Sequence, residues 1–190
     1  MKKYMKSIMK LAIACLLLSV GCSNSVSYDE ALAKNQEQFE DASMIEDATF
    51  LVESKSRSML AIELLTLATA SGYSSAVVSF AKQTLPEHQK LNEEIEDLSD
   101  EKNITLPDAL SDGHQKLLSE LTSVSRQDFD RTFSGIMSRI NDENNSIFTT
   151  KATRASDPDI RAFAARKLDL LRAHSKLLSE MQSQLLNTSD

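Results

Sequence analysis

The sequence predicts an all-helical protein, built as an antiparallel up-down four-helix bundle with short extra helices. Apolar residues recur at steps of three and four in four long segments, which is the period of a helix face. Gly and Pro number 4 and 3, and aromatic residues make up 5% of the chain, so the residues typical of strands and tight turns are scarce. With 190 residues, 41% of them apolar, the chain can bury one compact core.

The first 21 residues have the parts of a bacterial signal peptide. A basic start, MKKYMKSIMK, precedes the apolar run LAIACLLLSV, which is shorter than the roughly 20 apolar residues that cross a bilayer. Ser19, Val20 and Gly21 then precede Cys22, a pattern that resembles the lipobox of exported lipoproteins. We expect Cys22 to carry the lipid and to begin the mature chain. Ordinary cleavage that leaves Cys22 as a free thiol is the alternative.

The expected organisation is a signal peptide over residues 1–21, a lipidated tether over 22–28 and one helical domain over 29–190. Because Cys15 leaves with the signal peptide and Cys22 is acylated, the folded domain is expected to hold no thiol, which excludes disulfides, cysteine–zinc sites and thiol catalysis. Ser23, rather than Asp, follows Cys22, which favours the outer membrane of a Gram-negative cell envelope.

The charge of the mature chain limits its partners. The leader holds four Lys and no acidic residue, so its removal takes the formal charge from -7 to -11. Such a surface repels phosphate backbones, and no basic stripe counters it, so we expect no nucleic acid partner. The expected contacts are the membrane, through the lipid on Cys22, and a partner protein of the envelope.

The helices are expected in a definite order, each with its own start or stop signal. Gly72 is suited to end the first long helix in a left-handed conformation, the sequence from Ser125 to Asp128 resembles a capping box, and Pro158 suits a first helical turn. No internal repeat is evident, which disfavours a solenoid. The expected helices cover about residues 29–40, 45–71, 74–103, 112–122, 125–153 and 156–181.

Three titratable residues interrupt the predicted apolar faces: Glu63, His88 and His174. Glu63 lies in a segment that is apolar almost all round, where a buried carboxylate costs several kcal/mol unless it is paired, ligated or protonated. Each histidine lies between leucines on its own helix. A buried polar cluster, in which Glu63 is hydrogen-bonded to a histidine, is the favoured interpretation. Ligation of iron, manganese or zinc by the three residues is the alternative.

The candidate ligands lack the pattern of a di-iron bundle, because neither histidine follows a Glu-x-x-His spacing. The chain also lacks a Gly-rich phosphate loop, a Gly-x-Ser-x-Gly sequence and a His-Glu-x-x-His sequence. We therefore expect an interaction or binding protein rather than an enzyme, with a degenerate ferritin-like metal protein or oxidase as the alternative.

Several short matches, in order from Asp47 to Met181, resemble the bacterial ferritin-like family known as domain of unknown function 4142. The resemblance implies a ferritin-like bundle and an exported or membrane-attached protein, and it implies no reaction. Where members commonly have a histidine in the third long helix, this chain has Asn141, which disfavours a metal site further. The matching pieces are residues 47–50, Glu63 ahead of 67–68, 77–81 leading to 87–88, 103–107, 114–115, 129–131, 157–160, 163–164 and His174.

Overall fold

The computed structural model describes residues 25–187, and the predicted signal peptide and Cys22 lie outside this part of the chain. The described residues form six helices and no strand, which confirms the all-helical prediction. Within this range no helix is both long and apolar enough to cross a bilayer. The helices are α1 (Tyr28–Gln38), α2 (Ala42–Ser71), α3 (Ser75–Glu101), α4 (Asp112–Ser123), α5 (Arg126–Arg154) and α6 (Pro158–Asn187).

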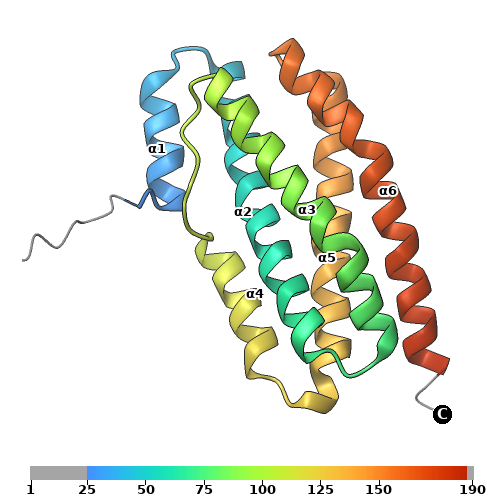
Figure 1. The fold of residues 1–190 in the computed structure, drawn as a ribbon. Coiled ribbons are helices and arrows are strands. Elements are labelled where there is room, and N and C mark those ends of the chain that lie inside the picture. The colour runs from blue at the N-terminus through green and yellow to red at the C-terminus, as the bar shows by residue number, and fades with distance from the viewer. Residues whose placement is uncertain (1–24, 188–190) are drawn as a thin grey trace, which may run out of the picture.

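The four long helices pack side by side, and each contacts two others. Both α2 and α6 contact α3 and α5, and every one of these pairs is antiparallel (Figure 1). The chain nevertheless departs from the predicted up-down order. Helices α3 and α5 run in the same direction, because residues 102–125, including α4, return along the outside of the bundle before α5 begins (Figure 1).

The helix boundaries follow from capping side chains. Ser125 Oγ accepts the amide N–H of Asp128, so the predicted cap at Ser125 is confirmed. The Asp128 carboxylate accepts the Ser125 hydroxyl instead of its backbone N–H, so the reciprocal bond of a capping box is absent. Pro158 is the first residue of α6, where its missing N–H leaves no helical hydrogen bond unmade. Gly72 ends α2 with φ -56°, so the predicted left-handed conformation is wrong. A Cβ at this position would lie 2.6 Å from the Ala68 carbonyl oxygen, and this close approach explains the glycine.

The apolar core has two clusters, one toward each end of the bundle. One cluster surrounds Phe80 and Phe133 near the α2–α3 turn, and the other surrounds Phe148 and Phe163 near the α5–α6 turn. Burying one such side chain contributes about 1.5–3 kcal/mol, so each cluster stabilises its own end.

The two helical hairpins, α2–α3 and α5–α6, are built on one plan. The Asp-x-Thr-Phe sequence at 47–50 recurs at 130–133, and the same offset relates the two turns. Gly72 and Ala155 occupy equivalent places, with φ and ψ of -56° and 133° in the first and -56° and 134° in the second. This correspondence is an internal repeat that the sequence reading did not detect, because few of the paired positions are identical.

Each repeated aspartate reaches across to the turn of the other hairpin. Asp47 Oδ2 accepts the amide N–H of Asp157 at 2.8 Å, and Asp130 Oδ2 accepts that of Ser74 at 2.6 Å. The second oxygen differs: Asp47 pairs with Lys151 Nζ at 2.9 Å, whereas Asp130 accepts another backbone N–H. The feature that the two ends share is therefore an aspartate that accepts a backbone N–H of the other hairpin's turn.

Candidate functional site

A buried polar layer separates the two apolar clusters at the middle of the bundle. It includes His88 on α3 and His174 on α6, whose side chains are buried, at 4% and 2% exposure. The prediction that both histidines face the core is confirmed. Their rings stack, with centroids 4.8 Å apart and planes inclined at 29°.

Glu87, rather than Glu63, supplies the carboxylate of this layer. His174 Nε2 lies 2.6 Å from Glu87 Oε2, and the carboxylate accepts this hydrogen bond. Glu63 is exposed, so the prediction that it is buried beside a histidine is wrong. The helical period places Glu63 with Thr66 and Ala70, on a face of α2 whose side chains stay exposed.

Burial determines the protonation of His88. Removal from water, and to a lesser extent the neighbouring charge of His174, lowers the pKa of His88 to about 3, so its imidazole is neutral at pH 7. The Nδ1 atoms of both histidines are buried, and neither has a hydrogen-bond partner among the described residues. An unpaired buried nitrogen costs about 1–3 kcal/mol, so the histidine pair is a locally unfavourable arrangement that the surrounding packing maintains.

The residues of this layer do not form a metal site in the present arrangement. Residues 25–187 contain no group of three His, Cys, Asp or Glu placed to hold an ion, so Glu63, His88 and His174 do not come together as predicted. Nitrogen lone pairs lie in the plane of the imidazole ring, and stacked rings keep these planes apart and close to parallel. Two stacked imidazoles therefore cannot point at a common ion about 2 Å from each.

Asn141 belongs to the same layer and is satisfied by hydrogen bonds. Its Nδ2 donates to Ser175 Oγ at 2.7 Å, and Asn145 Nδ2 donates to the same hydroxyl at 3.1 Å. Ser175 in turn donates to the Leu171 carbonyl. The Asn141 amide thus ties α5 to α6.

The middle of α2 contributes polar residues that the sequence reading missed. Five consecutive polar residues, 54–58, are all buried, because α1, α3, α4 and α5 each pack against α2. Within this run Arg57 Nε donates to Asn144 Oδ1 at 3.0 Å, and Ser56 Oγ lies 2.7 Å from His114 Nδ1. Burial, followed by the charges of Arg57 and Arg139, lowers the pKa of His114 to about 4. A run of polar residues in a long helix predicts exposure, so only the packing of four neighbours identifies these groups as buried.

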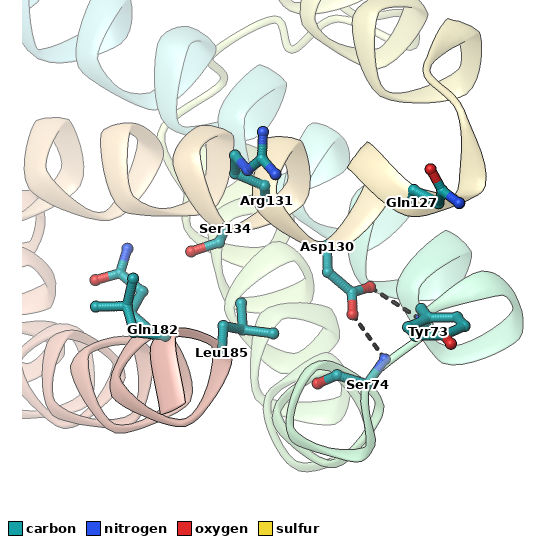
Figure 2. A pocket seen from close by; sticks show the side chains of 9 residues that line it. Tyr73, Ser74, Gln127, Asp130, Arg131, Ser134, Gln182 and Leu185 are labelled. Carbon is teal, nitrogen blue, oxygen red and sulfur yellow. Dashed lines mark hydrogen bonds between the residues drawn. The ribbon is translucent and has the colours of Figure 1, made fainter. Parts of the chain in front are cut away.

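A cavity of about 470 Å³ opens at one end of the bundle, between the α2–α3 turn, the start of α5 and the end of α6 (Figure 2). Asp130 lies at its inner side, with both oxygens held by the backbone of the turn (Figure 2). The lining combines Tyr73, Leu185 and Leu186 with Arg131, Ser134 and Gln182.

The rim of this cavity exposes apolar and cationic side chains together. Tyr73 is 72% exposed and Leu186 74%, and they are the exposed large hydrophobic residues of the described chain. The Arg126 guanidinium lies 5.6 Å from the centre of the Tyr73 ring. Arg131 is mostly exposed and lies 3.6 Å from Asp128. The sequence carries no motif for this cavity, because its lining comes from three separate segments.

The equivalent place at the other end is closed by the chain itself. Lys102 Nζ, at the end of α3, pairs with Asp157 at 2.9 Å and Asp159 at 2.5 Å. Helix α1 packs against α2 there, and Phe39 and Ile104 join the apolar cluster of that end. The place equivalent to the cavity is therefore filled at this end, although a separate hollow of about 570 Å³ lies beside it, between the end of α3 and residues 103–108.

Comparison with known proteins identifies a family but no individual relative. A search of curated proteins and a search of solved structures found no match. The family model described as "Domain of unknown function (DUF4142)" matches residues 31–181, which cover all of α2 to α5 and most of α1 and α6. The chain belongs to this family.

Proposed function

We propose that the chain is an exported lipoprotein of the cell envelope, whose helical domain binds a partner or ligand at the α2–α3 end of the bundle. The observation that carries the binding role is the open cavity, with Tyr73 and Leu186 exposed at its rim. Exposed aromatic and aliphatic side chains beside a cavity are typical of binding sites.

The anchor is proposed from the sequence of the leader and from Cys22. Growth with labelled palmitate tests it: the full chain should take up label, and Cys22→Ala should not. A Cys22→Ala chain that still carries label, or a native chain that carries none, would reject the lipoprotein assignment.

The finer fold assignment belongs to the same proposal. We infer a ferritin-like four-helix bundle, because the helices combine antiparallel neighbours with one long crossover connection, as ferritin-like bundles do. The family membership is compatible with this inference and adds no activity to it.

A matched pair of positions tests the binding role in living cells. A photoreactive amino acid replaces Tyr73 in one strain, and in the other it replaces Ser156, the exposed residue at the equivalent turn. We expect a discrete cross-linked product from position 73 and none from position 156. Equal products from both positions would contradict a specific binding surface at the α2–α3 end, and no product from either position would reject a protein partner there.

Metal binding is the second candidate function. It is favoured by the two buried Nδ1 atoms without partners and by the adjacent Glu87, and it is opposed by the stacked ring geometry and the exposed Glu63. Elemental analysis of protein purified without chelators distinguishes the candidates. One equivalent of iron, manganese or zinc that is lost in His88→Gln would establish a metal protein, and less than about a tenth of an equivalent would reject it.

A further inference from the structure

The cavity at the α2–α3 end differs from its counterpart at two positions that define its chemistry. By the correspondence between the hairpins, Arg131 stands where the first hairpin has Ala48, and Leu185 stands where it has Lys102. Ala48 is fully buried and Lys102 forms two ion pairs across the turn, whereas Arg131 and Leu185 line an open cavity. These two differences place a cation, Arg131, beside open space. They also place an apolar residue, Leu185, where the other end has the ion pairs of Lys102.

The apolar surface of the closed end is covered by the protein's own residues. Phe39, Ile104 and Leu106 pack on the cluster that contains Ala48 and Leu51. In the second hairpin the residue equivalent to Leu51 is Ser134, which lines the cavity. A bound molecule would therefore cover apolar surface at the α2–α3 end, as Phe39, Ile104 and Leu106 cover it at the other end.

The charges around the cavity select the sign of such a molecule. Both oxygens of Asp130 accept backbone N–H groups, so local dipoles partly compensate the negative charge of this carboxylate. Arg126 is the cation beside Tyr73, and Arg131 is the cation of the cavity lining. The ion pair of Arg131 with Asp128 is long, solvent-exposed and weak. A guanidinium binds a carboxylate through two parallel hydrogen bonds, which an exposed and flexible Arg131 can provide.

We propose that this cavity binds small amphipathic carboxylates, with the carboxylate on Arg131 and a short aliphatic or aromatic body between Tyr73 and Leu185. The inference rests on the proposed binding role of this end and names its ligand class. The volume of about 470 Å³ lies in the usual range for small-molecule sites.

A comparison of hexanoate with hexanamide tests the class, because the two have nearly the same shape and differ in charge. The whole chain is placed in lipid nanodiscs with labelled leucine methyl groups, and the shifts of Leu185 and Leu186 are followed by NMR. We expect hexanoate to bind about tenfold more tightly than hexanamide. Arg131→Ala should remove this difference.

Arg172→Ala is the matched control. Arg172 is also an exposed arginine paired with an aspartate three residues before it, and it lies about 20 Å from Leu185 along α6 by the helical rise. The preference for hexanoate should persist in this variant.

The possible results separate this inference from the proposed function. Equal affinities for hexanoate and hexanamide would overturn the carboxylate class while leaving the cavity as a binding site. No methyl shift with either probe would overturn the ligand site itself. A hexanoate preference that depends on Arg131 would support the inference even if position 73 forms no cross-link in cells.

Discussion

An aspartate holds a helical turn at each end of the bundle, but the residues around the two aspartates differ. At each end an aspartate near the start of one hairpin holds the turn of the other, through Asp47 at one end and Asp130 at the other. The Asp47 end is then closed by Lys151, Lys102 and α1, whereas the Asp130 end opens as a cavity beside an exposed Tyr73. The comparison indicates that the chain's own residues cover the Asp47 end, whereas the Asp130 end keeps the cavity on which the proposed binding role rests.

Removal of the two aspartates should give the largest difference between the ends. Asp47→Ala leaves Lys151 without its carboxylate and the Asp157 N–H without its acceptor, in a place where Asp47 is 1% exposed. We expect a loss of about 3–4 kcal/mol in unfolding free energy by urea denaturation at pH 7. Asp130→Ala should lose about 1–2 kcal/mol, because water can reach the freed N–H groups at the open end. Equal losses would contradict the assignment of one end to stability.

The layer between the ends should make stability depend on pH. The folded-state pKa of His88 is about 3 and its ordinary value is 6.5, so the unfolded chain binds the additional proton between these values. Stability is therefore fully present above pH 6.5 and is lost as the pH falls from 6.5 toward 3. We expect His88 to account for a loss of about 2 kcal/mol between pH 7 and pH 5.

His88→Gln is the control for this pH effect, because glutamine does not titrate in the range. Its unfolding free energy should fall much less between pH 7 and pH 5 than that of the native chain. The remaining slope is expected from His114, which acts in the same direction and is weaker because it is only partly buried. An unchanged slope in His88→Gln would show that His88 is not buried in its neutral form.

Removal of the Lys102 ion pairs at the closed end should lower stability less than removal of Asp47 or a fall in pH to 5 does. Lys102→Ala removes the contacts with Asp157 and Asp159 and should cost about 1 kcal/mol, because Lys102 and Asp157 are largely covered by protein. Lys34→Ala, which removes the exposed pair with Glu30 on α1, is the matched control and should cost less than Lys102→Ala, because water screens this pair. Urea denaturation measures the unfolding free energy of both variants. A larger loss for Lys34→Ala would argue against a stabilising role of the Lys102 ion pairs.

Introduction of an equivalent ion pair at the α2–α3 end should change stability least of all these substitutions. The double substitution Leu185→Lys with Ser74→Asp reproduces the positions of Lys102 and Asp157, and aspartate still caps α3. We expect unfolding free energy within about 0.5 kcal/mol of the native chain. Hexanoate binding, measured by the NMR titration above, should fall below detection. Retained hexanoate binding would show that a Lys–Asp ion pair at these positions does not close the cavity.

The sequence could predict the helices because helical periodicity and capping are local properties. The spacing of apolar residues located the four long helices, and the faces of α3 and α6 placed His88 and His174 in the core. The same reasoning failed for Glu63, because the segment of α2 around it is apolar on nearly every side and periodicity alone cannot say which side the neighbouring helices cover. It also could not show that residues 54–58 are buried, since four other helices determine their burial.

By itself the sequence determined an all-helical domain behind a predicted lipoprotein leader, because composition, periodicity and capping act within a few turns of one chain segment. Only the tertiary structure decided the crossover between α3 and α5, the replacement of Glu63 by Glu87 beside His174, and the contrast between a sealed end and an open one. Each of these depends on which distant segments lie together. A few identical positions, such as Asp47 and Asp130, acquire their common role only when the two hairpins pack against each other.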